Sequence, residues 1–228
     1  MCGIFVATMT TKAMTFYRTS VGKKVVMAIT GFIAFTWVTI HMIGNLQIYL
    51  GAERLNAYGE LLHSMGSFLW VFRGIMTVVI ISHIVAATQV TLQNIDARPT
   101  RYKIHRFRET TYAARTMWWG GPLVALFLLY HLMHLTFGNV HADFTDNIYN
   151  NVVFGFQTPW TSGVYIVAML MLGLHLYHGV WSMFQSVGAN HPKWNKWRRI
   201  FAVAFGLAIA VGNISIPVAV LSGIVKPV

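Results

Sequence analysis

Five long apolar segments dominate this chain of 228 residues and limit what it can fold into. Each has about 20 or more residues with few charges, which is the length that a helix needs to cross the hydrocarbon core of a bilayer. The segments are continuously apolar and do not alternate as the strands of a membrane barrel do. The sequence therefore predicts an all-α, polytopic protein with one integral membrane domain, residues 1–228. The predicted spans are about 25–50, 68–92, 117–137, 159–187 and 200–225.

The composition agrees with a membrane protein. Hydrophobic residues make up 56% of the chain and charged residues 10%, whereas a soluble domain has about 25% charged residues. The net charge is +11, but the cations lie in loops between spans, so we expect contact with lipid headgroups and no nucleic-acid partner. The single cysteine, Cys2, excludes an intrachain disulfide and an iron–sulfur cluster held by this chain.

Basic residues gather on one side of the predicted membrane. The N-terminal segment, the loop between spans two and three and the loop between spans four and five share fourteen of them, whereas the other two loops hold only Arg54 and four acidic residues. Because cytoplasmic loops carry the excess of Lys and Arg, we expect the N-terminus in the cytoplasm and the C-terminus outside. The fourteen cations are Lys12, Arg18, Lys23, Lys24, Arg98, Arg101, Lys103, Arg106, Arg108, Arg115, Lys193, Lys196, Arg198 and Arg199.

Four spans each carry a histidine well inside the apolar stretch. A polar imidazole at membrane depth is costly and usually marks a functional site. In an apolar helical bundle, the commonest role of a neutral imidazole is to ligate a metal or a haem iron. Four such residues on four helices predict two bis-histidine haems within a four-helix bundle. These histidines are His41, His83, His131 and His175.

Depth in the membrane sorts these histidines into pairs. At a rise of about 1.5 Å per residue, His41 and His131 lie in the outer half of their spans, and His83 and His175 lie closer to the cytoplasmic side. The sequence therefore predicts an outer pair, His41 with His131, and an inner pair, His83 with His175. The two irons would then lie roughly 10–15 Å apart along the membrane normal, which suits electron transfer.

Two of the spans offer a second histidine three residues later, His134 after His131 and His178 after His175. Each lies about 60° around the helix from its neighbour, so both members can face the bundle interior. We favour His131 and His175 as ligands because their depths match better. Glycines in the spans predict either gaps for a flat haem or close helix packing. These are Gly31, Gly44, Gly74, Gly120, Gly121, Gly173 and Gly179.

With these residues in place, the chain resembles a known family over nearly its whole length. It is similar to the cytochrome b membrane anchor of succinate dehydrogenases and fumarate reductases, in the single-chain, five-helix, diheme form. The likeness lies in a few short motifs that occur in the right order and in the right spans. They are residues 20–24 (SVGKK), 27–31 (MAITG), 41–45 (HMIGN) with His63 following, 82–83 (SH), 130–131 (YH), and His175 followed by 179–182 (GVWS).

The resemblance implies a function within complex II, the succinate:quinone oxidoreductase of the respiratory chain. A flavoprotein subunit oxidises succinate, and an iron–sulfur subunit passes electrons to the anchor. The anchor holds two haem b groups on His41, His83, His131 and His175 and reduces a membrane quinone, with menaquinone favoured over ubiquinone. The resemblance also implies that the chain lies in the bacterial cytoplasmic membrane and contacts lipids. It is compatible with a higher oligomer of the complex. Taken alone, this anchor does not oxidise succinate.

The chain departs from some family members at one position. Members that move protons across the membrane carry a glutamate two residues before the fourth-span ligand, whereas this chain has Gly173 there and no carboxylate deep in any span. The quinone site is less defined by sequence than the haem ligands. Candidate contacts to quinone or haem propionates are Arg18, Ser20, Lys24, Tyr112, Arg115 and Trp181 on the cytoplasmic side, His63, Trp70 and Arg73 on the outer side, and His134 and His178 within the bundle.

Three other readings stay open. A diheme cytochrome b anchor of a different quinone-linked dehydrogenase would share the same histidine pattern. A non-haem di-iron membrane enzyme needs about eight histidines near the cytoplasmic surface, where only His105 and His191 lie in this chain. A transporter with a proton relay is disfavoured because no intramembrane carboxylate is present.

Overall fold

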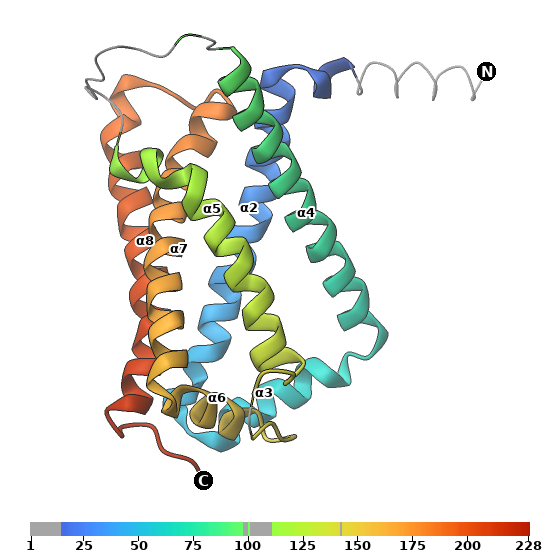
Figure 1. Ribbon diagram of the computed structural model, residues 1–228, viewed down its shortest axis with the longest axis vertical. Helices are drawn as coiled ribbons and strands as arrows, with labels where there is room; N and C mark the ends of the chain where they lie inside the picture. The colour runs from blue at the N-terminus through green and yellow to red at the C-terminus, as the bar shows by residue number, and fades with distance from the viewer. Residues whose placement is uncertain (1–14, 98–99, 101–110, 142) are drawn as a thin grey trace, which may run out of the picture.

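Five long helices run the length of the molecule in the computed structural model (Figure 1). The structure describes residues 15–97, 100, 111–141 and 143–228. By length and composition each of the five can cross a membrane, and no strand occurs among the described residues. The chain is therefore an all-helical, multi-pass membrane protein. The five helices are α2 (Ser20–Asn45), α4 (Ser67–Asp96), α5 (Tyr112–His131), α7 (Pro159–Ser186) and α8 (Pro192–Leu221).

Local capping signals explain where several helices begin. The Thr19 side chain accepts a hydrogen bond from Gly22 N at the start of α2, and Thr111 accepts one from Ala114 N at the start of α5. As expected, α7 begins at Pro159, whose missing N–H is not needed in the first turn.

The last span differs most from its predicted range. Helix α8 begins at Pro192, two turns before residue 200, because His191 caps it by accepting from Lys193 N. The helix runs through Pro217 and ends at Leu221. Gly223 follows with a φ of 73°, a left-handed conformation that favours glycine, so the chain turns away before residue 225.

Two short helices occupy loops in which the sequence predicted no helix. Helix α3 (Ala52–Ser64) follows a 3-10 turn, η1 (Leu46–Leu50), and helix α6 (Ile148–Gln157) precedes α7. Both lie across one end of the bundle (Figure 1). The Asn56 side chain of α3 joins them, because its Oδ1 accepts from Tyr149 N and its Nδ2 donates to Asn147 Oδ1.

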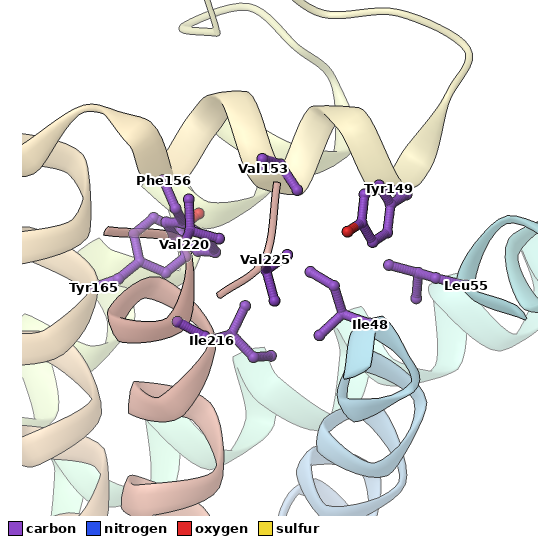
Figure 2. Packing of buried hydrophobic residues seen from close by; sticks show 10 residues of the cluster. Ile48, Leu55, Tyr149, Val153, Phe156, Tyr165, Ile216, Val220 and Val225 are labelled. Atoms are coloured by element: carbon purple, nitrogen blue, oxygen red, sulfur yellow. The ribbon is translucent and has the colours of Figure 1, made fainter. Parts of the chain in front are cut away.

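A cluster of ten buried apolar side chains lies at this same end (Figure 2). It joins η1, α3 and α6 to the start of α7 and the end of α8, so the short helices seal the end of the bundle. Its members are Ile48, Leu55, Tyr149, Val153, Phe156, Tyr165, Ile216, Ala219, Val220 and Val225.

Packing between the long helices sets the position of the histidines. Helix α2 packs against both α4 and α7, and α5 packs against α7. Helix α8 packs closely along α7, where a Cβ built on Gly206 would lie 2.6 Å from the carbonyl oxygen of Gly173. Four helices thus contribute the deep histidines, and α8 supports α7.

The two ends of the bundle differ in charge. The starts of α2, α5 and α8 and the ends of α4 and α7 lie together (Figure 1), and we call this the basic end after Arg18, Lys23, Lys24, Arg115, Lys193, Lys196, Arg198 and Arg199. The opposite end, which carries α3 and α6, we call the short-helix end. Cys2, Lys12, His105 and the cations of residues 98–108 lie outside the described residues.

Candidate functional site

The structure brings the four deep histidines together as two pairs. The ring centroids of His41 on α2 and His131 on α5 are 5.7 Å apart, with an angle of 84° between the planes. Those of His83 on α4 and His175 on α7 are 6.2 Å apart, with an angle of 65°. Each pair spans two helices that are far apart in sequence, and both pairings match the predicted ones.

The distance between the pairs along the bundle can be read from two helices. The ring of His83 lies beside Gly31, ten residues before His41 on α2. The ring of His131 lies beside Tyr165, ten residues before His175 on α7. Ten residues of helix rise about 15 Å, so two antiparallel helices indicate the same separation.

The surroundings of His83 favour one neutral tautomer. Its Nδ1 is 3.1 Å from the carbonyl oxygen of Met27 and 3.2 Å from Thr30 Oγ1. Thr30 itself donates to Val26 O over 2.7 Å, so Nδ1 of His83 carries the proton and donates. This leaves Nε2 with its lone pair, which is the arrangement of a metal-ligating histidine with a carbonyl partner.

His175 has a different environment. Its Nδ1 is buried and has no hydrogen-bond partner among the described residues. A buried ring nitrogen without a partner is destabilising by about 1–3 kcal/mol. A ligand or metal between His83 and His175 would engage one nitrogen of this ring.

At the other pair, the His41 ring stacks on Trp37, with centroids 5.7 Å apart. The Asn45 amide, one turn later, donates to Nε2 of His41 over 3.2 Å. This bond occupies the nitrogen that an iron commonly uses. A metal at this level therefore requires Asn45 to release Nε2, or His41 to bind through Nδ1.

His131 contacts a tyrosine that the sequence analysis missed. The Tyr165 hydroxyl lies 3.3 Å from Nδ1 of His131 and 2.9 Å from Nδ1 of His134. His131 is the last residue of α5, and His134 lies in the single π-helical turn that follows, η2 (Leu132–Thr136). The one sequence signal for Tyr165 was its position. It lies ten residues before His175 on α7, which corresponds to the difference in depth between the two histidine pairs.

His134 is buried, with 2% of its surface exposed, so it belongs to the interior as expected. Its ring stacks on His141 with centroids 4.9 Å apart. His141 in turn donates from Nε2 to the carbonyl oxygen of Asn151 and accepts at Nδ1 from the backbone N–H of Asp143. This histidine was not predicted as a site residue, because it lies in a loop whose path only α6 determines.

The glycines in the spans fall into three groups. A Cβ on Gly31 would lie 3.2 Å from Cε1 of His83, so this glycine makes room for the imidazole. Gly44 and Gly173 serve close packing, against Tyr58 and against α8 respectively. The remaining predicted glycines have no heavy atom within 4 Å of such a Cβ: Gly74, Gly120, Gly121 and Gly179.

The candidate contacts at the basic end do not form one site. Ser20 and Lys24 are exposed at the start of α2. Arg115 lies over the ring of its neighbour Tyr112, at 5.8 Å from the centroid. Trp181 on α7 is covered by the Arg198 guanidinium at 4.6 Å.

Of the two lysines at the start of α2, Lys23 is buried and Lys24 is exposed. Its ammonium donates to the carbonyl oxygen of Arg18 over 3.1 Å. It lines an open pocket with Tyr17, and Gln89 and Asp96 of α4 form the other wall. One residue turns a helix by about 100°, and the apolar pattern of α2 did not define its rotation sharply enough to distinguish the two lysines.

At the short-helix end, two of the three candidates, Trp70 and Arg73, are in contact with each other, and no described interaction joins His63 to them. Arg73 lies over the ring of Trp70, 4.9 Å from its centroid, near the start of α4. His63 is partly exposed on α3, where its Nδ1 contacts the carbonyl oxygen of Gly59. His178, a candidate within the bundle, is half-buried on α7, three residues after His175 and toward the basic end.

The separation of the two imidazoles in each pair fits a bis-histidine metal group, and the pair of His41 and His131 also requires Asn45 to release Nε2 of His41 or binding through Nδ1. Metal–imidazole bonds of about 2 Å on both sides of one ion place the ring centroids roughly 6 Å apart. The observed 5.7 Å and 6.2 Å agree with this separation, the Nδ1–H donation of His83 agrees with ligation through its Nε2, and a metal bound to Nδ1 of His175 would give that nitrogen a partner. No protein-family model, curated protein or solved structure matches this chain.

Proposed function

We propose that this chain is the diheme cytochrome b anchor of a succinate:quinone oxidoreductase. One observation carries the proposal: two pairs of imidazoles lie at two depths of one membrane bundle. One pair lies between α2 and α5, and the other lies between α4 and α7. His41 and His131 would hold one haem b, and His83 and His175 the other. Haem b supplies one-electron transfer at each level when it is bound.

The chain's own residues prepare the two levels for that role. Met27 fixes His83 as a neutral Nδ1–H tautomer, so that Nε2 remains available. Helices α2 and α7 hold the two pairs about 15 Å apart along the bundle. The chain thereby provides two proposed haem sites at different depths of the membrane.

The basic end is the proposed docking side for the flavoprotein and iron–sulfur subunits. Lys193, Lys196 and Arg199 are at the surface there, and a cationic surface favours partners with acidic surfaces. By the positive-inside rule this end faces the cytoplasm of a bacterial cell, and the C-terminus lies outside. The His83–His175 pair is closer to this end, so electrons would enter there and reach a membrane quinone, with menaquinone favoured.

The test is a reduced-minus-oxidised visible spectrum of the purified chain, with haem quantified per polypeptide. We expect two haem b per chain in the wild type and at most one in His83→Ala. His191→Asn is the matched control, because His191 is exposed at the start of α8, and asparagine can replace it as the cap of that helix. It is expected to keep both haems.

A colourless wild-type preparation, or full retention of both haems in His83→Ala, would overturn the assignment. Copurification separates the succinate reading from that of another quinone-linked dehydrogenase. We expect a subunit with covalent flavin and an iron–sulfur subunit to accompany the anchor in mild detergent. A different soluble dehydrogenase in their place would assign the chain to that complex.

A further inference from the structure

Tyr165 stands between a proposed haem ligand and a histidine that the proposed function leaves without a role. Its hydroxyl is within hydrogen-bond distance of Nδ1 of His131 and Nδ1 of His134, at 3.3 Å and 2.9 Å. We propose that Tyr165 is the positioning residue for His131: its oxygen accepts a hydrogen bond from Nδ1–H of His131, while its O–H donates a hydrogen bond to Nδ1 of His134. This inference rests on the proposed function and deepens it.

The direction of these hydrogen bonds follows from counting protons. A tyrosine hydroxyl has one proton, so it donates to one Nδ1 and accepts from the other. If it donated to His131, the proton of that neutral imidazole would sit on Nε2, and Nε2 could not bind iron. Iron ligation through Nε2 therefore requires His131 to donate and His134 to accept.

The remaining partners agree with this direction. His134 then carries its proton on Nε2 and accepts at Nδ1 from Tyr165. Its neighbour His141 donates from Nε2 to Asn151 O and accepts at Nδ1 from Asp143 N, so its own two nitrogens are already engaged. His141 packs on His134 by stacking and does not compete for the Tyr165 hydroxyl.

The position of Tyr165 is well determined by packing. Its side chain is 5% exposed, and its ring makes edge contacts with Phe127 and Phe156 at centroid distances of 4.9 Å and 4.7 Å. The ring of Tyr130 stacks on His134 at 5.6 Å. These packing contacts hold the Tyr165 hydroxyl beside His131. The packing side chains themselves contact no polar atom of His131.

A partner on the second nitrogen raises the basicity of a ligating histidine. A more basic ligand stabilises ferric over ferrous iron, so Tyr165 is expected to lower the midpoint potential of the His41–His131 haem. His134 strengthens the effect because a hydroxyl that donates becomes a better acceptor. Among the described hydrogen bonds, Tyr165 is the link between His134 and His131.

The experiment is a redox titration of both haems in the purified complex. Tyr165→Phe keeps the ring and removes the hydroxyl. We expect this variant to raise the midpoint potential of one haem and to leave the midpoint potential of the other haem unchanged. His134→Leu is expected to raise the same potential by a smaller amount. The double variant is expected to lie close to Tyr165→Phe, because the hydrogen-bonded link from His134 to His131 is lost with the hydroxyl.

Tyr149→Phe is the matched control. Tyr149 belongs to the same buried cluster, but its hydroxyl donates to the carbonyl oxygen of Lys226 and contacts no histidine among the described interactions. Its loss is expected to leave both potentials unchanged. The affected haem is identified by its absence from His131→Ala, which separates it from the haem of His83 and His175.

Unchanged potentials in Tyr165→Phe with two haems present would overturn this inference and leave the proposed function standing. Equal shifts of both haems, or an additive double variant, would overturn it as well. If Tyr165→Phe loses one haem, the test passes to His134→Leu. A raised midpoint potential of that same haem in His134→Leu supports the inference, and an unchanged midpoint potential overturns it. A wild-type complex without haem b would overturn both proposals.

Discussion

The imidazole of His83 on α4 lies directly against Gly31 on α2, where a Cβ would stand 3.2 Å from Cε1 and 3.6 Å from Nδ1 of the ring. The Met27 carbonyl that accepts from the same imidazole lies one turn earlier on α2. One short stretch of α2 therefore provides both the space for His83 and the hydrogen bond that orients it.

Substitution at Gly31 tests this arrangement. We expect Gly31→Val to displace the His83 ring, because the branched side chain would occupy the position of Cε1. The expected result is loss of one of the two haems, with the His41–His131 haem retained, measured by haem content per chain and by the remaining spectrum.

Gly163→Val is the control for that prediction, because no heavy atom lies within 4 Å of a Cβ built on Gly163 of α7. It is expected to keep two haems. Retention of both haems in Gly31→Val would show that the contact with His83 is not needed to hold the ligand.

Helix α8 depends on close approach to α7. A Cβ on Gly206 would lie 2.6 Å from the carbonyl oxygen of Gly173 and 3.3 Å from Tyr177 Cβ, so the neighbour is backbone and cannot move away alone. We expect Gly206→Leu to reduce stability by about 1–3 kcal/mol, as overpacking of a tight interface does. Thermal unfolding in detergent measures the change.

Leu207→Ala provides the comparison on the same helix, since Leu207 is 59% exposed in the structure. Its unfolding midpoint is expected to stay close to that of the wild type. An equal decrease in both variants would argue against the α7–α8 contact as the cause.

Asn56 joins the two short helices. Removal of its side chain leaves the backbone N–H of Tyr149 without its partner and removes one of the two hydrogen bonds to Asn147 Oδ1, which still accepts from Asn150 N. We expect Asn56→Ala to destabilise the short-helix end by about 1–3 kcal/mol. Hydrogen exchange at α3 and α6 should increase, while exchange in α4 stays as it is.

Glu60→Ala, at an exposed position of α3, is the matched variant and is expected to leave exchange in α6 unchanged. Equal exchange rates for Asn56→Ala and the wild type would remove Asn56 from the contacts that seal this end.

Orientation in the membrane can be measured with single cysteines in a Cys2→Ser background. Trp160 at the start of α7 and Trp194 at the start of α8 are both exposed but lie at opposite ends of the bundle. We expect a membrane-impermeant thiol reagent to label Trp160→Cys in intact cells. Trp194→Cys should react only after the membrane is opened, and the reverse pattern would invert the proposed topology.

Much of the site was accessible from the sequence because depth in a membrane is nearly one-dimensional. His41 and His131 could be matched from helix rise and loop charge alone, and the structure places their rings 5.7 Å apart. The same reasoning did not find Tyr165, because a tyrosine in an apolar span has no polar signal that separates an interior hydroxyl from an ordinary buried ring.

The sequence alone determined the number of spans, their order and the levels of the four histidines. These depend on lengths of apolar chain and on a constant rise per residue, both of which are local properties. The tertiary structure decided which face of each helix meets which neighbour. It placed Gly31 beside His83, buried Lys23 rather than Lys24, and brought Tyr165 to His131 and His134. Lipid and protein neighbours are equally apolar, so hydrophobicity does not encode helix rotation, and only the packed contacts between helices set it.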